Sequence, residues 1–78
     1  MADTHQLTSN QRMADALLAG LEDDPTTLEE FLAAAQRRGL GYEGIAKELY
    51  GRTGGVVSLS YTTVKRWLID FGIVEEAS

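Results

Sequence analysis

The chain has 78 residues, enough for one domain with a modest hydrophobic core and too few for two. Its hydrophobic content of 44% and charged content of 24% are typical of a soluble globular protein and argue against wholesale disorder. Cysteine is absent, which excludes disulfide frameworks, zinc fingers and thiol catalysis, and the single histidine, His5, has no second histidine for a metal site. We therefore expect no metal or cofactor.

Two kinds of segment are also missing from the sequence. No apolar run approaches the ~20 residues of a membrane span. The N-terminal residues lack the basic and apolar regions of a signal peptide. We expect a cytoplasmic protein without a membrane partner.

Charge is segregated along the chain, whose net charge is −5. Residues 1–30 contain seven acids and one base, Arg12, whereas residues 31–69 contain six bases and two acids, Glu43 and Glu48. The six bases are Arg37, Arg38, Lys47, Arg52, Lys65 and Arg66. An acidic total disfavours polyanion binding, but the distribution of charge matters more than the sum. The basic half is thus a candidate for nucleic acid, and the acidic half for a basic protein partner.

The first predicted helix covers residues 9–21 and follows a flexible segment, residues 1–8. Its apolar stripe consists of Met13, Ala14, Leu17, Leu18 and Leu21. Thr8 or Ser9 can cap its start, and Gly20 with the acidic run before Pro25 ends it. That run lacks the alternating oxygen ligands of a calcium loop, so we interpret its acids as favourable charges near the start of the next helix.

The second predicted helix covers residues 26–38. Thr26 or Thr27 is the expected N-cap, with Glu29 or Glu30 as its reciprocal partner. Its buried face is predicted to consist of Leu28, Phe31, Leu32 and Ala35. Gly39 suits a left-handed C-cap.

The third predicted helix begins near Tyr42 and ends around residues 52–54, because the Gly54-Gly55 pair continues a helix only at a cost of about 1 kcal/mol per glycine. Its apolar stripe consists of Tyr42, Ile45, Ala46 and Leu49. Residues 56–59 are β-prone but too short for a sheet, and we expect an extended segment that pairs with nothing.

The fourth predicted helix starts at Ser60 as N-cap and runs to about Phe71, where Gly72 stops it. Its apolar positions are Val64, Trp67, Leu68 and Phe71. A tryptophan at this spacing is a core residue far more often than a stacking platform. Ile73 and Val74 are expected to fold back onto the core, and residues 75–78 form an acidic tail. The sequence thus predicts a single all-α domain over residues 9–74, a small bundle of about four helices.

Residues 39–44 match the dinucleotide-binding pattern G-x-G-x-x-G. That fingerprint requires a preceding strand and a βαβ unit, whereas here a helix precedes it and fewer than forty residues follow. We interpret these glycines as a helix C-cap and a tight connection.

Residues 42–49 (YEGIAKEL) and 59–68 (LSYTTVKRWL) carry the sequence's most informative pattern. They resemble the S-Y-x-x-I-A-x-x-L and V-S-x-x-T-V-x-R-W-L segments of helix-turn-helix domains in bacterial and phage regulators, transposases and recombinases. The resemblance covers somewhat less than half of the chain and assigns the helix-turn-helix to residues 42–71. It departs from the family in its turn, which usually has three or four residues. The insertion over residues 52–57 resembles the longer turns of transposon-type relatives.

This resemblance implies sequence-specific binding of double-stranded DNA by the last helix. The side chains expected to contact DNA are Ser60, Tyr61, Thr62, Thr63, Lys65 and Arg66, with Arg52 as a candidate backbone contact. Arg66 is the first choice for a base contact, since arginine suits the acceptor edge of guanine, and the hydroxyls suit phosphate.

Three other expectations accompany this one. A lone module binds weakly, so a homodimer on two half-sites is the natural arrangement, with the first helix as a candidate dimer surface unless it simply packs across the other three. A second function class is a protein-interaction module that uses the acidic N-terminal half. An enzyme is not expected, because the paired acids Asp23-Asp24 and Glu29-Glu30 point about 100° apart on a helix and the chain offers no nucleophile–base pair.

Overall fold

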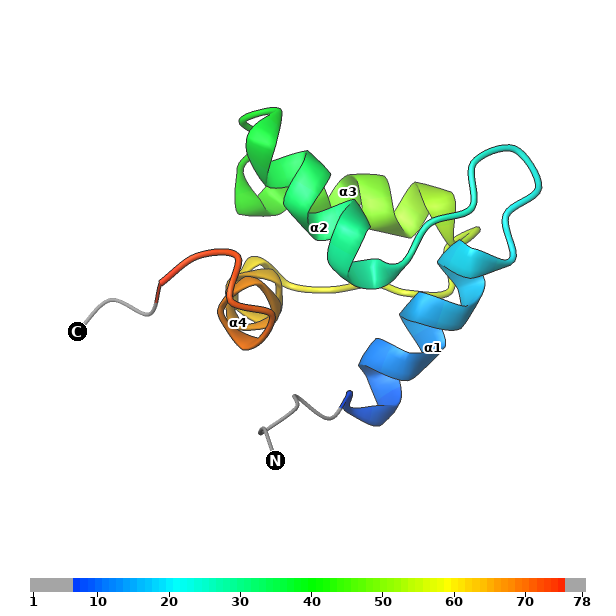
Figure 1. The fold of residues 1–78 in the computed structure, drawn as a ribbon, viewed down its shortest axis with the longest axis horizontal. Coiled ribbons are helices and arrows are strands. Elements are labelled where there is room, and N and C mark those ends of the chain that lie inside the picture. The colour runs from blue at the N-terminus through cyan, green and yellow to red at the C-terminus, as the bar shows by residue number, and fades with distance from the viewer. Residues whose placement is uncertain (1–6, 76–78) are drawn as a thin grey trace.

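Four helices make up the regular secondary structure of the computed structural model, which describes residues 7–75 (Figure 1). They are α1 (Ser9–Ala19), α2 (Leu28–Arg37), α3 (Tyr42–Arg52) and α4 (Tyr61–Asp70). No strand occurs among the described residues. The predicted all-α bundle of four helices is therefore confirmed. Residues 1–6 of the predicted flexible segment and residues 76–78 of the predicted acidic tail lie outside the described residues.

Three of the helices begin at a hydroxyl N-cap that the sequence predicts. The side chains of Thr8, Thr27 and Ser60 each accept a hydrogen bond from the backbone N–H three residues later. The reciprocal bond of a capping box is present at α1, where the Thr8 N–H donates to Gln11 Oε1 at 3.0 Å. The start of α2 has a second acceptor, because the Leu28 N–H donates to Asp15 Oδ1 of α1 at 2.8 Å. Local hydroxyl caps thus set three of the helix starts, and the additional bond to Asp15 ties α2 to α1.

Helices α2, α3 and α4 end in the same way, with a left-handed glycine just after the C-cap. In each case the residue after this glycine donates its N–H to the carbonyl five positions earlier. After α3, for example, the Gly55 N–H donates to the Tyr50 carbonyl at 2.8 Å. After α3 this turn needs two positive-φ residues, Gly54 (φ 67°) and Gly55 (φ 84°), which only glycine adopts at little cost. The chain is thereby sent back along α3.

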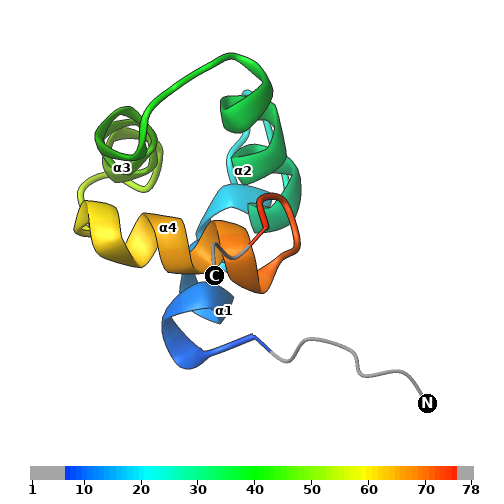
Figure 2. The same ribbon diagram turned by 90° about the vertical axis from the view of Figure 1, so that its left-hand side faces the viewer.

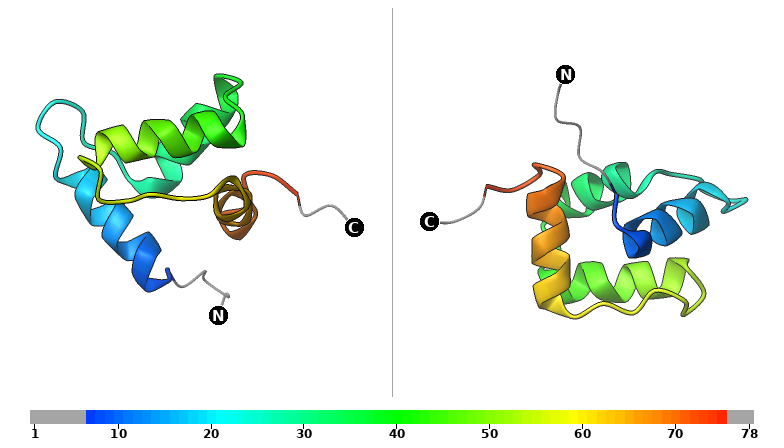
Figure 3. Two further views of the ribbon diagram at one scale, coloured as in Figure 1. Left: turned by 180° about the vertical axis from the view of Figure 1, so that it is seen from behind. Right: turned by 90° about the horizontal axis from the view of Figure 1, so that it is seen from below.

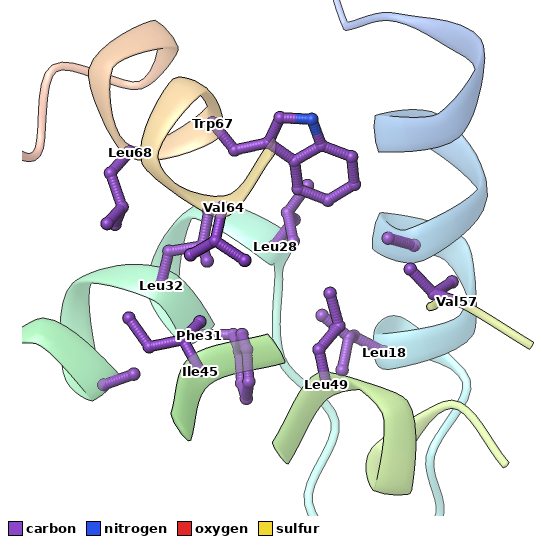
Figure 4. Close-up of a cluster of buried hydrophobic side chains, with 12 residues drawn as sticks. Leu18, Leu28, Phe31, Leu32, Ile45, Leu49, Val57, Val64, Trp67 and Leu68 are labelled. Atoms are coloured by element: carbon purple, nitrogen blue, oxygen red, sulfur yellow. The ribbon is translucent and has the colours of Figure 1, made fainter. Parts of the chain in front are cut away.

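One hydrophobic core joins all four helices (Figure 4). Its buried members are Ala14, Leu18, Leu28, Phe31, Leu32, Ala35, Ile45, Leu49, Val57, Val64, Trp67 and Leu68. Trp67 is 4% exposed, which confirms its assignment to the core, and its indole reaches from α4 toward α1 (Figure 4). Ile73 and Val74 pack against this core after Gly72, as predicted.

The buried face of α1 differs from the predicted stripe. Met13 is 44% exposed and Leu17 only half-buried, whereas Gln11 is fully buried beside Ala14 and Leu18. A glutamine is tolerated there because both ends of its amide are hydrogen-bonded: Oε1 accepts from Thr8 N, and Nε2 donates to Asp70 Oδ2 at 3.2 Å. The polar contact to α4 thus rotates α1 away from the orientation that its apolar residues alone predict.

Helix α4 crosses α3 steeply. Figure 1 shows α4 end-on and α3 along the page, and Figure 2, turned by 90°, shows the reverse. The linker of residues 53–60 runs back along α3, so that the first residue of α4 meets the first residue of α3. There the rings of Tyr42 and Tyr61 stack with centroids 6.3 Å apart and planes 9° apart. Seen from below, α4 lies along one edge of the molecule (Figure 3, right).

Thr53 holds the start of this linker. Its side chain is 6% exposed; the hydroxyl donates to the Leu49 carbonyl at 2.9 Å and accepts from Val57 N–H at 3.1 Å. Residues 56–59 form no strand, as predicted, but Val57 is buried in the core. The linker is thus anchored at its centre, and this fixes where α4 starts.

Candidate nucleic-acid interface

Helix α4 is anchored to the core along one narrow face and free along the others. Val64, Trp67 and Leu68 are buried, at 0%, 4% and 0% exposure. Residues on the opposite side are exposed: Thr62, Lys65 and Arg66. Between Glu48 and Asp70 the sequence has no acidic residue. The outward side of α4 therefore combines a hydroxyl and two cations on a helix whose orientation is fixed by packing.

The hydroxyls at the start of α4 have a structural role. Ser60 Oγ accepts from Thr63 N–H at 3.3 Å and lies 3.2 Å from Thr63 Oγ1. Ser60 is exposed and Thr63 half-buried. These two predicted contact residues thus form the N-terminal cap, and Thr62 is the exposed hydroxyl on the outward side.

Tyr61, another predicted contact residue, lies between the two helices. Its side chain is 56% exposed although its ring stacks on Tyr42. Stacking favours this orientation of the ring beside α3, which lowers the conformational entropy that the side chain would lose on contacting a ligand.

The two cations of α4 differ in their surroundings. Lys65 is exposed and has no carboxylate within 4.0 Å in the described part of the chain. Arg66 Nε lies 3.9 Å from Asp70 Oδ1, and the arginine side chain is 67% exposed. An exposed ion pair of this length is weak, so the guanidinium remains available to a stronger acceptor.

Arg52 is not brought together with the other predicted contact residues. It is the last residue of α3, about 15 Å along the helix axis from Tyr42 at 1.5 Å per residue. Its guanidinium forms an ion pair with Asp24 at 3.1 Å and lies 5.9 Å from the Phe31 ring centroid. Its contacts join α3 to α2 and the acidic loop.

Lys47 is a cation beside α4 that the sequence reasoning did not single out. It is exposed on α3 and lines a hollow of about 450 Å³ together with Glu43, Gly44, Ala46, Leu59 and Tyr61. No carboxylate lies within 4.0 Å of its ammonium group among the residues described. Lys47 lies next to Tyr61 only because the linker returns along α3, so no local sequence pattern predicts that Lys47 belongs to the candidate interface.

A second hollow, of about 470 Å³, lies on the side of α2 and α3 that faces the acidic loop. Both signs of charge line it: Asp24, Glu30 and Glu48, and Arg37, Arg38 and Arg52. Arg38 and Glu48 form an ion pair at 3.3 Å. Of the acids of the N-terminal half that line this hollow, Asp24 is balanced by its ion pair with Arg52 of α3.

Within residues 7–75 no group of three or more histidine or acidic side chains is arranged to hold a metal ion. The described helices are too short or too polar to cross a membrane. Comparison of the chain with protein-family models, with curated proteins and with solved structures found no match.

Proposed function

We propose that the protein binds double-stranded DNA in a sequence-specific manner, with α4 in the major groove. The observation that carries this proposal is the exposed side of α4, where Thr62, Lys65 and Arg66 stand on a helix held rigidly by three buried side chains. An α-helix fits the width of the major groove, and arginine and lysine match the acceptor edge of guanine. The crossing of α3 and α4 is in keeping with a helix-turn-helix whose turn is lengthened to residues 53–60.

The residues divide into two roles within this proposal. Arg66 contacts a base, because its fork of donors suits guanine O6 and N7. Lys65 and Thr62 flank it on α4 and contact a base or the adjacent phosphates. Lys47 and Tyr61 line the neighbouring hollow and contact the DNA backbone.

The number of contacts from one α4 is small, and binding by a single copy is therefore weak. Two copies on half-sites about one helical turn apart double the contacts. We propose this arrangement, which makes the protein a small regulator or an accessory factor acting on a two-fold symmetric site.

A charge-reversal pair tests the proposal. Lys65→Glu and Arg37→Glu change the net charge by the same amount, and both residues are exposed on helices, with no ion pair within 4.0 Å in the described residues. Affinity for a random duplex pool at low salt is measured for both variants and for the parent protein. We expect Lys65→Glu to reduce binding strongly and Arg37→Glu only slightly. Equal losses would assign binding to net charge alone and count against α4.

A protein-interaction module is the second candidate function, and one observation favours it. The acids Glu22, Asp23, Asp24, Glu29 and Glu30 are all exposed, and of these only Asp24 is in an ion pair within the described residues. Such a surface suits a basic partner protein. If Lys65→Glu leaves the biological activity intact while Glu29→Lys abolishes it, this second function replaces DNA binding.

A further inference from the structure

Asp70 occupies an unfavourable place for an acid. It is the last residue of α4, where the partial negative charge of the helix C-terminus repels a carboxylate. Its side chain is 27% exposed, so its charge is also partly removed from water. Some compensating contact must hold it there, and the structure shows two.

The first contact comes from α1. Gln11 is fully buried, and its Nε2 donates to Asp70 Oδ2 at 3.2 Å. The other end of the same amide accepts from the Thr8 N–H at 3.0 Å as part of the α1 capping box. Gln11 is thus fixed by burial and by hydrogen bonds at both ends of its amide. Asp70 is in turn fixed by Gln11.

The second contact points outward, to the residue proposed to read a base. Asp70 Oδ1 lies 3.9 Å from Arg66 Nε, four residues earlier on the same helix. The contact to the carboxylate is at Nε, and it does not use the end-on edge of the guanidinium, which is formed by the two terminal nitrogens. Two parallel N–H donors on that edge suit a bidentate contact to guanine. The order of contacts therefore runs from the α1 cap through Gln11 and Asp70 to Arg66.

We propose that Asp70 is a positioning residue that sets the sequence specificity of Arg66. This inference rests on the proposed DNA binding and deepens it. The weak pair with Asp70 favours those rotamers of the 67%-exposed Arg66 side chain that keep it beside the carboxylate, so part of its conformational entropy is already lost before DNA arrives. The same carboxylate repels phosphates and weakens binding to every sequence. Asp70 thus lowers non-specific affinity while it raises discrimination.

Asp70→Asn removes the charge responsible for both effects, while its amide oxygen can still accept from Gln11, and the two effects are separated by measuring affinity for three duplexes. Asp24→Asn is the matched control: it removes one negative charge and one Asp–Arg ion pair, at Arg52 instead of Arg66. Each protein is titrated with a duplex carrying the motif selected from a random pool, with a duplex changed at one base pair of that motif, and with an unrelated duplex. The folded fraction is checked by Trp67 fluorescence.

We expect Asp70→Asn to lower the ratio of affinities at one base pair about 1.5-fold to fivefold, the range that an exposed ion pair is worth. Affinity for the unrelated duplex should be equal or higher, and Asp24→Asn should preserve the ratio. An unchanged ratio in Asp70→Asn would overturn the inference. If the parent protein binds no duplex at all, the proposed function itself fails, which is a different result.

A second comparison distinguishes positioning from a structural role. In an Arg66→Ala background, Asp70→Asn should have no further effect on discrimination, because the side chain through which it acts is absent. A purely structural effect would reduce affinity for all three duplexes in both backgrounds. That outcome would overturn the inference even if Asp70→Asn were less stable than the parent.

Discussion

Thr53→Val is the most informative stability variant, because it removes the hydrogen bonds of one hydroxyl and changes little else. The replacement keeps the shape of a side chain that is 6% exposed and leaves no large cavity. It removes the hydroxyl that accepts from Val57 N–H at 3.1 Å and donates to the carbonyls of Leu49 at 2.9 Å and Tyr50 at 3.3 Å. Both carbonyls keep another donor, the Thr53 N–H at 3.0 Å for Leu49 and the Gly55 N–H at 2.8 Å for Tyr50. The Val57 N–H is therefore the group left without this bond, on a residue that is 4% exposed.

A buried donor that loses its acceptor costs about 1–3 kcal/mol. For 78 residues, a typical free energy of unfolding is about 4–12 kcal/mol, so the loss is a substantial fraction of the total. Each kcal/mol lowers the Tm of a domain this size by roughly 4–8 °C. We therefore expect a clearly measurable decrease in both quantities.

Urea denaturation followed by tryptophan fluorescence measures this loss, because Trp67 is the chain's one tryptophan and is buried. Thr62→Val is the matched control, since it makes the same chemical change at an exposed position of α4. The control should stay within about 0.5 kcal/mol of the parent. If Thr53→Val were as stable as the parent, the Thr53 hydroxyl would not hold the linker, and the reasoning would be wrong.

Trp67→Ala should cost about 3–5 kcal/mol of stability, measured by circular dichroism during denaturation, and a normally melting variant would contradict the packing of α4. Asp15→Ala should cost about 1.5–3 kcal/mol because the buried Leu28 N–H loses its charged acceptor, whereas Asp15→Asn should cost less; equal costs would refute the cap. Arg66→Ala should cost about 1–3 kcal/mol of binding at one base position, and an equal loss on every duplex would make Arg66 a phosphate contact. Log affinity for one bound copy should fall with log salt concentration at a slope of about −3 to −5, near −0.9 per neutralised phosphate, and a flat response would argue against DNA.

Much of the fold follows from local signals. Thr27 and Ser60 cap helices because a hydroxyl beside an unpaired N–H is a short-range interaction that the sequence specifies directly. Gly39 and Gly72 end helices for a similarly local reason. The buried faces of α2 and α4 could likewise be predicted from spacing, since every buried residue of these two helices is apolar.

The burial of Gln11 could not be predicted in this way. Its amide nitrogen donates to Asp70, which lies 59 positions later in the sequence, and no local pattern predicts that contact. The spacing of apolar residues alone therefore predicts that Met13 lies on the buried face of α1, whereas Met13 is half-exposed.

The candidate interface could be predicted only in part. The residues of α4 follow from the helix register, but those of α3 depend on where the linker runs. The position of Arg52 in the lengthened turn predicts a contact to the DNA backbone, yet Arg52 lies at the far end of α3 from Tyr61. Lys47 lies beside Tyr61 because the chain turns back at Gly54 and Gly55.

Selection of bound fragments from a random duplex DNA pool, repeated at two salt concentrations, tests DNA binding through α4 most directly. We expect enrichment of one motif, two-fold symmetric if two copies bind, and loss of that enrichment with Lys65→Glu but not with Arg37→Glu. Well-folded protein that enriches no sequence, or a motif that Lys65→Glu still selects, would contradict the proposal.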